Sequence, residues 1–381
     1  MTVAAYLYPW DVDGDPGAAD RIAALGVTEV SLAAAYHAVR AVTLFHPGHR
    51  IVTRDAAVYH RRDPARWAGA HLVPADPDPA DVGSFERAAD ALRAAGLRVN
   101  AWVVVTHNGR LAAAHPECGV RNAYGDPYPW ALCAGSPAVA EYAATLAAEI
   151  AALDAVSDVE LEACGWYGYD HGSAHDKTGG APSAPVTRLL DACFCADCVA
   201  TLRVAGADPD AIAAAVRAAL DTGASVPAEL AATLATVRTA TAASFLEHVV
   251  AAVRAADPGA GVLVHAHPDP AEAGSNPGFE LPALLGPAGA DGIILACPGP
   301  AGPAASFVAS TVQAVQAASA LPPGRRVIAT LPAVAALGVD IGELPAKAKA
   351  VLAARATDLR LYHAGLASAA DHLSQREVAE L

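Results

Sequence analysis

Short runs of Val, Leu and Ile alternate along the chain with longer Ala-rich segments whose apolar positions recur at helical spacing. The apolar runs are typical of strands buried in a parallel sheet. The Ala-rich segments are typical of helices that cover such a sheet. The pattern predicts strands at residues 4–8, 29–33, 98–105, 158–163, 261–265, 292–296, 326–330 and 359–362. It predicts helices between them, including residues 16–25, 84–95, 137–153, 228–256, 306–319 and 344–356. Eight strand–helix units predict an α/β fold, a single (β/α)8 TIM barrel over residues 1–381.

Three long insertions interrupt this regular spacing, at residues 36–83, 108–136 and 164–226, after the second, third and fourth predicted strands. Because each follows a strand, we expect all three to gather over the face where the strands end. There they form the walls of a binding pocket or simply enlarge the surface. Aromatic residues make up only 6% of the chain, yet these insertions contain Trp67, Tyr124, Tyr128, Trp130, Trp166, Tyr167 and Tyr169. Aromatic rings of this kind suit the stacking of sugars.

Polar and aromatic side chains follow most of the predicted strands, at the end where active sites of such barrels lie. A single histidine at this edge is more often a hydrogen-bonded structural residue than a functional one. The set as a whole is more informative, and it predicts a binding site. The candidate substrate-binding residues are Tyr8, Trp10, His37, His107, Asn108, Tyr167, His171, His265 and His363.

A cysteine cluster stands out in the third insertion, where Cys193, Cys195 and Cys198 lie within six residues. The odd total of seven cysteines fits thiolates gathered around a metal better than a secreted disulfide framework. With a fourth thiolate from Cys133 or Cys164, the cluster predicts a tetrahedral zinc site. Four sulfur ligands leave no open position, so this zinc is expected to be structural and to pin the 164–226 insertion to the barrel. The alternative is a set of free buried thiols.

Charge and hydropathy exclude several classes of protein. The formal net charge is −15, which argues against a nucleic-acid binder. The first residues have no basic segment before their apolar stretch, so no signal peptide is predicted. The longest uncharged stretch, residues 292–324, is broken by prolines, so no membrane span is predicted. We therefore expect a cytoplasmic protein, whose oligomeric state, including a homo-oligomer, the sequence leaves open.

The region 124–202 resembles the glycoside hydrolase family 42 β-galactosidases. The resemblance rests on Cys133 ahead of a helix, on Glu162 at the end of the fourth strand, and on the Cys193-x-Cys195-x-x-Cys198 run. It implies that Glu162 is the catalytic acid/base and that a zinc ion is held by Cys133, Cys193, Cys195 and Cys198.

The sequence also departs from that family. Glu162 follows Leu161 where the family has Asn, and no Asp or Glu occurs at residues 325–338, where the family carries its nucleophile. Glycoside hydrolysis requires two carboxyl groups. The partner of Glu162 must then come from Asp170, Asp269, Asp11 or Glu160, and we favour Asp170. Glu160 lies on the same side of the strand and deeper in the barrel, where its charge would raise the pKa of Glu162.

Three functions remain open from sequence. The favoured one is cleavage of a small glycoside or sugar-derived metabolite, with Glu162 and Asp170 as the catalytic pair. The second is a hydrolase or isomerase that uses a divalent metal bound by histidines and a carboxylate, drawn from His37, His107, His265, His267 and Asp269. The third is an inactive barrel that binds a sugar without cleaving it, which the missing acid after the seventh strand supports.

Overall fold

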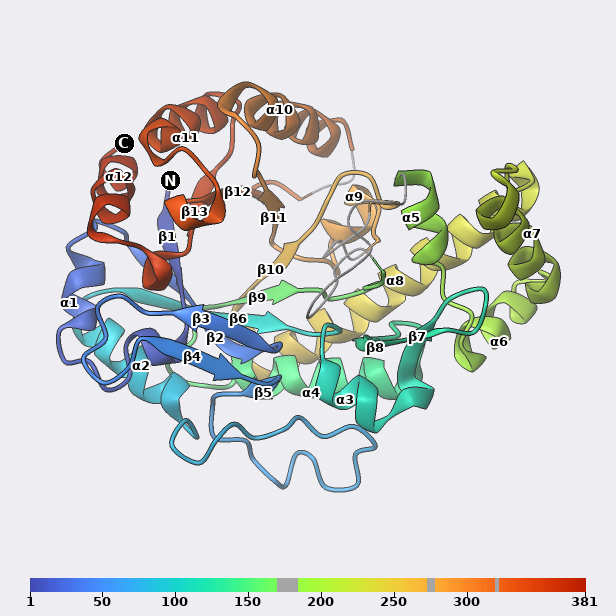
Figure 1. The fold of residues 1–381 in the computed structure, drawn as a ribbon, viewed down its shortest axis with the longest axis horizontal. Helices are drawn as coiled ribbons and strands as arrows, with labels where there is room; N and C mark the ends of the chain where they lie inside the picture. Colours follow the sequence, from blue (N-terminus) through green and yellow to red (C-terminus); the bar gives the residue numbers. More distant parts are fainter. Residues whose placement is uncertain (170–183, 273–277, 319–321) are drawn as a thin grey trace.

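The computed structural model describes residues 1–169, 184–272, 278–318 and 322–381. Eight parallel strands form a closed barrel in the order β1-β13-β12-β11-β10-β9-β6-β2, and pairing of β1 with β2 completes the circle (Figure 1). The fold is therefore the predicted α/β TIM barrel. The barrel strands are β1 (Val3–Leu7), β2 (Glu29–Tyr36), β6 (Arg98–Val104), β9 (Asp158–Glu162), β10 (Gly261–His265), β11 (Gly292–Ala296), β12 (Arg326–Pro332) and β13 (Asp358–Tyr362).

Helices surround the strands and bury one Ala-, Val- and Leu-rich face each (Figure 1). Small alanine side chains let helices such as α4 and α8 pack closely against each other. The helices between successive strands are α1 (Ala18–Ala23), α2 (Ser84–Ala94), α4 (Pro137–Ala151), α8 (Ala228–Ala256), α9 (Leu281–Leu284), α10 (Ala301–Ala317) and α11 (Leu344–Ala353), and α12 (Ala369–Ala379) follows the last strand. Within the described ranges, no helix combines the length and apolar character needed to cross a bilayer.

Helix α10 begins furthest from its predicted start, whereas the other predicted helices differ by at most three residues at either end. The sequence pattern predicts a helix from residue 306, but α10 begins at Ala301 and includes Pro303 in its first turn. Proline is compatible with that position because the first turn needs no N–H donor, and the ring fixes a helical backbone angle. The sequence therefore underestimated this helix by reading Pro303 as a break.

The three insertions lie where predicted, each after the carboxyl end of a strand. The first carries the hairpin β3 (Val39–Val42) and β4 (Ile51–Arg54) and the short β5 (Ala57–Val58), which pairs with β2. The second carries α3 (Gly109–Ala114) and the hairpin β7 (Gly119–Arg121) and β8 (Pro127–Leu132). The third carries α5 (Ala184–Leu190), α6 (Ala196–Val204) and α7 (Pro209–Thr222), at the right of Figure 1.

Candidate functional site

The candidate acid Glu162 is the last residue of β9 and lies half-buried at the carboxyl end of the barrel. Its Oε2 accepts a hydrogen bond from Trp102 Nε1 at 2.7 Å. Trp102 comes from the neighbouring strand β6, and its ring is fully buried. In the part of the chain that the structure describes, no cation forms an ion pair with Glu162. The carboxylate is therefore oriented by the indole without being neutralised.

Four tyrosines surround this carboxylate. Burial raises the pKa of Tyr6, Tyr36, Tyr167 and Tyr362, and the charge of Glu162 raises each one further. Their hydroxyls consequently stay protonated at neutral pH and can donate hydrogen bonds. The rings of Tyr6 and Tyr36 pack edge-on against Trp102 at centroid distances of 4.7 and 4.6 Å. The result is a rigid aromatic cradle around one acid.

The chain makes a sharp turn directly after Glu162. Ala163 has φ of +48°, in the left-handed region that non-glycine residues avoid. Thr106 holds this turn, because its hydroxyl donates to the carbonyl oxygens of Ala163 at 2.6 Å and Gly165 at 3.1 Å. Strained backbone held by its surroundings is concentrated at functional sites. Its position next to Glu162 supports this carboxylate as the centre of the site.

Glu160 has a different environment, although it lies only two residues before Glu162. It is fully buried in the barrel, where Arg360 of β13 donates from Nε at 2.8 Å and its terminal nitrogen lies 2.7 Å away. Asn100 and Glu29 complete this network. Because Arg360 balances the charge of Glu160, Glu160 is not the uncompensated carboxylate that the sequence predicted beside Glu162. Glu160 is therefore engaged in the barrel interior and unavailable as a catalytic partner.

The other three candidate partners are placed differently. Asp11 is buried, accepts a hydrogen bond from the Tyr8 amide at 2.8 Å, and burial raises its pKa to about 7. Asp269 has a side chain 43% exposed and pairs with Arg188 at 2.9 Å. Asp170 lies outside the described residues, as does His171. The pairing of Glu162 with Asp170 therefore stays a prediction.

Several predicted binding residues form one aromatic wall. The ring of His37 stacks on Tyr36 at 4.1 Å and on His107 at 4.2 Å, and His107 stacks on Tyr167 at 4.4 Å. The Tyr167 hydroxyl also lies 2.8 Å from His107 Nδ1. The structure thus brings together residues from three different strand ends, as the sequence predicted for this edge.

Tyr8, Trp10 and His363 form a second stack. The Tyr8 ring lies 4.6 Å from Trp10 and 4.3 Å from His363, both in stacked orientation. His363 is fully buried, burial lowers its pKa to about 3, and its Nδ1 accepts a hydrogen bond from the Gly365 amide at 3.1 Å. This imidazole is therefore neutral at physiological pH. The Tyr8 hydroxyl donates to Tyr36 at 3.2 Å and connects the stack to the cradle.

Asn108 has both polar atoms of its side chain engaged within the protein. Its Oδ1 caps α3 by accepting from the Leu111 amide at 3.0 Å, and its Nδ2 lies 3.4 Å from the Tyr142 hydroxyl. This geometry gives Asn108 a structural task at the start of α3. It does not point to direct contact with a ligand.

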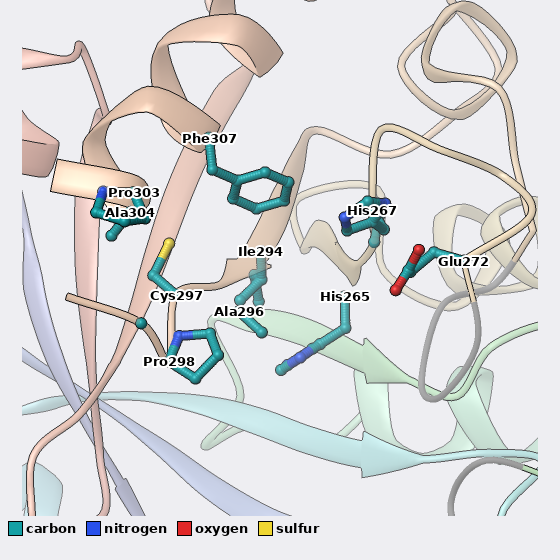
Figure 2. Close-up of a pocket in the computed structure, with 12 residues that line it drawn as sticks. His265, His267, Glu272, Ile294, Ala296, Cys297, Pro298, Pro303, Ala304 and Phe307 are labelled. Carbon is teal, nitrogen blue, oxygen red and sulfur yellow. The ribbon is translucent and has the colours of Figure 1, made fainter. Parts of the chain in front are cut away.

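A pocket of about 390 Å³ opens beside the cradle. Figure 2 shows the ring of Phe307 and the side chains of Ile294 and Ala296, with His265 and His267 across from them. His265 ends β10, and its Nε2 lies 3.1 Å from the Tyr6 hydroxyl. The pocket is thereby linked to the residues around Glu162, and it is of the size that accommodates a small ligand.

The prediction from sequence missed Tyr6, Trp102, Arg360 and Tyr362. Tyr6, Trp102 and Arg360 lie inside strands, whereas the candidates chosen from sequence are concentrated at strand ends and just after them. At the end of β13, His363 was chosen and not Tyr362. The signal was present, because Arg360 and Tyr362 alternate with leucines, as do side chains that point to one side of a strand. A charged residue with this spacing in an otherwise apolar strand indicates a partner inside the barrel.

The four predicted cysteines gather into one buried cluster, with all sulfurs within 4.8 Å of one another. Cys133 Sγ lies 3.4 Å from Cys198, and 3.6 Å from both Cys193 and Cys195. Hydrogen bonds from the other three thiols lower the pKa of Cys195 well below its ordinary value. Cys164 is buried elsewhere, so the structure selects Cys133 as the fourth member. The cluster joins the start of α4 to α6 and can bind a metal ion.

The histidines of the alternative metal site do not converge in this way. Two groups of potential metal ligands occur among the described residues, the cysteine cluster and the trio of His71, Glu117 and Cys118. Neither contains His37, His107, His265, His267 or Asp269. The geometry therefore gives no support to a catalytic metal at the carboxyl end of the barrel within the described ranges.

No known protein-family model matches the sequence, and no curated protein matches it either. The PgaB (BpsB) glycoside hydrolase domain from Bordetella bronchiseptica is 18% identical, with a TM-score of 0.63 over 100% of this chain and 99% of that one. The β-amylase catalytic domain from Paenibacillus polymyxa is 12% identical, with a TM-score of 0.57 over 100% and 98%. A GH42 β-galactosidase from G. stearothermophilus is 12% identical, with a TM-score of 0.50 over 77% of this chain and 48% of that one.

These solved structures agree with the fold that the sequence resemblance implies. The chain spans about half the length of the GH42 enzyme and nearly all of the PgaB domain. At these identities the likeness establishes the architecture, a glycoside-hydrolase-like TIM barrel, and leaves the reaction to be argued from the site.

Proposed function

We propose that this protein is a glycosidase of small glycosides or sugar-derived molecules, in which Glu162 is the general acid. The observation that carries the proposal is the position of Glu162, at the end of the fourth barrel strand and inside a cradle of protonated tyrosines. A sugar bound there would stack on aromatic rings and accept hydrogen bonds from phenolic hydroxyls. The fold shared with glycoside hydrolases supports the same reaction class.

The chemistry assigned to this site follows from the two states of a carboxyl group. Protonated Glu162 gives its proton to the oxygen of the scissile bond as that bond breaks, so the leaving group departs as an alcohol. The second carboxylate attacks the anomeric carbon, and water later hydrolyses that bond, or it activates a water that attacks the carbon directly. Trp102 positions the carboxyl through its N–H donor. We assign the second carboxylate to Asp170. Its separation from Glu162 would decide the outcome, about 5 Å for retention or roughly 6.5–9.5 Å for inversion.

We further propose that the cysteine cluster binds zinc and that the ion is structural. The sulfur separations of 3.4–3.6 Å are near the value of about 3.8 Å that a tetrahedron with Zn–S bonds of ~2.3 Å requires. Cys133, Cys193, Cys195 and Cys198 would hold the ion. When bound, zinc would supply a cross-link between the barrel helix α4 and the 164–226 insertion. It would have no role in the reaction, because four thiolates fill its coordination sphere.

A screen of the purified protein against aryl glycosides tests the enzyme assignment, with Glu162→Gln assayed in parallel. The amide keeps the shape of the carboxyl but carries no transferable proton, so we expect kcat to fall by about 10²–10⁴-fold while substrate binding persists. Turnover that is indifferent to this substitution would contradict the proposal. Ligand-induced stabilisation without turnover on any glycoside would instead identify a sugar-binding barrel, which the absence of acids at residues 325–338 favours.

Metal analysis of the same sample tests the zinc assignment. We expect about one zinc per chain, lost in Cys195→Ser together with thermal stability, while Cys164→Ser serves as the control outside the cluster. A metal-free protein of unchanged stability would show that the four residues are free thiols.

A further inference from the structure

A second pocket, of about 230 Å³, lies at the carboxyl face of the barrel. It is adjacent to the pocket of Figure 2, since Pro298 and Gly299 line both. Its walls are the segment after β11, the loop after β12, and the first turns of α10 and α11. A ligand in one pocket can therefore extend into the other around the Pro298–Gly299 segment.

Lys347, in the first turn of α11, lines this second pocket and is only 7% exposed. Across the described residues, no carboxylate pairs with it and no acceptor hydrogen-bonds to it. Its neighbour Cys297 does not supply a negative charge, because burial raises the pKa of that thiol to about 11. Burial also lowers the pKa of Lys347 itself. An ammonium so placed is destabilising unless something outside the chain offsets it.

Two helix amino termini add to the positive potential. Both α10 and α11 begin at the pocket, neither has a side-chain cap, and neither has an acidic residue in its first turn. At α10 the first amides, those of Ala301 and Gly302, have no intrahelical acceptor, whereas at α11 the Leu344 amide donates to Ile341 O and Pro345 has no N–H. Both helix dipoles disfavour a cation at Lys347. Asp340 and Glu343 also line the pocket, but both residues are exposed, and Asp340 is used to cap the Gly342 amide.

Lysine is also rare in this protein, where it accounts for three of the 25 basic residues. Lys349, two residues further along α11, is exposed, as expected for a lysine with no task. A buried ammonium at uncapped helix amino termini has the composition of an oxyanion site.

We infer that the pocket at Lys347 binds an oxyanion, a carboxylate or phosphate group. The substrate of the adjacent site would then be a sugar derivative that carries such a group, and this second statement rests on the proposed function. Lys347 would donate to the anion directly, and the first amides of α10 would contribute from the opposite wall. The neutral cradle around Glu162 would hold the sugar, while the charge is bound some distance from the bond to be cleaved.

Calorimetric titration tests this inference without any need for turnover. The probes are inorganic phosphate, glucuronate and, as the uncharged comparison, glucose. Each is titrated into the wild-type protein, Lys347→Met and the matched control Lys349→Met. We expect phosphate or glucuronate to bind the wild type and the control at least about 10-fold more tightly than Lys347→Met, since a charge-assisted hydrogen bond is lost. Lys347→Met should fold with an equal or higher Tm, because it removes an uncompensated buried charge.

The outcomes separate the two proposals. Stronger binding of phosphate than of glucuronate identifies a phosphate group, and the reverse order identifies a carboxylate. If an anion binds through Lys347 but no glycoside is cleaved, the pocket is supported and the enzyme assignment fails. If both anions bind Lys347→Met as tightly as the wild type, or neither binds the wild type more tightly than glucose, the inference is wrong whatever the activity of Glu162.

Discussion

Acidic side chains have opposite environments in two parts of the barrel. We call the barrel interior and the amino ends of its strands the floor, and the carboxyl ends of the strands the rim. On the floor, Glu160 is fully buried and ion-paired with Arg360, and Asp358 pairs with Arg326 at 3.0 Å. At the rim, within the described ranges, Glu162 receives an indole hydrogen bond, and Asp11 accepts from a backbone amide with His363 Nδ1 3.9 Å away. Acids paired with a cation stabilise the fold, and the ion pair leaves their carboxylates unavailable for proton transfer. The acids at the rim have no such cation beside them among the described residues, so they stay available to a bound ligand.

The largest difference in stability is expected when the same substitution is made at two positions on β9. Glu160→Gln leaves the buried Arg360 with the more distant carboxylate of Glu29, at 3.6 Å, so we expect the free energy of unfolding to fall by up to about 3 kcal/mol. Glu162→Gln should change it by less than about 1 kcal/mol, because no cation in the described part of the chain pairs with Glu162. Urea denaturation of both variants measures the difference. Equal losses of stability would mean that floor and rim are not distinct.

The pH dependence of stability should have opposite signs for a floor acid, Asp358, and a rim acid, Asp11. Although burial acts in the other direction, hydrogen bonds from Thr357 and Thr2 and the charge of Arg326 lower the pKa of Asp358 to about 2. Its ionised form therefore stabilises the fold above pH ~4, and this contribution is lost as the pH falls towards 2. We expect Asp358→Asn to be less stable by about 2 kcal/mol at pH 7, with a smaller difference from the wild type near pH 3.

Asp11 should show the reverse sign. Burial raises its pKa to about 7, so its contribution is full below pH ~4 and is lost as the pH rises through 7. Asp11→Asn should accordingly be more stable than the wild type at pH 8 by about 1–2 kcal/mol, with little difference at pH 4. Thermal unfolding across this pH range measures both variants. A parallel pH dependence of the two would contradict the distinction between floor and rim acids.

The smallest expected effect concerns the indole donors. Trp102→Phe removes the hydrogen bond to Glu162, and we expect kcat/KM to fall by about 3–10-fold with little loss of stability. The matched control is Trp67→Phe. Trp67 Nε1 donates a hydrogen bond of 2.9 Å to the buried Glu149, and this pair lies outside the cradle. That variant should lose stability and keep its activity. Similar values of kcat/KM for both variants would contradict a positioning role for Trp102.

The positions of the candidate residues were predictable from sequence where spacing in the chain decides the geometry, whereas their roles stay predictions. Glu162 and the histidines at 37, 107 and 265 follow strands, and parallel strands bring their ends to one edge. Trp102, Arg360 and Lys347 were missed because their importance depends on partners or pockets built by distant segments. Glu160 was misjudged for the same reason, since its counter-ion lies 200 residues further along the chain.

The sequence by itself determined the eight strands, the helices that cover them and three of the four clustered cysteines. These features depend on local periodicity and local spacing, which every short segment carries within itself. Only the tertiary structure decided that Cys133 rather than Cys164 joins the cluster and that Arg360 neutralises Glu160. It also decided that Lys347 is buried with no ion-pair partner among the described residues. Burial and charge pairing are properties of the space between segments, and closure of the barrel is what creates that space.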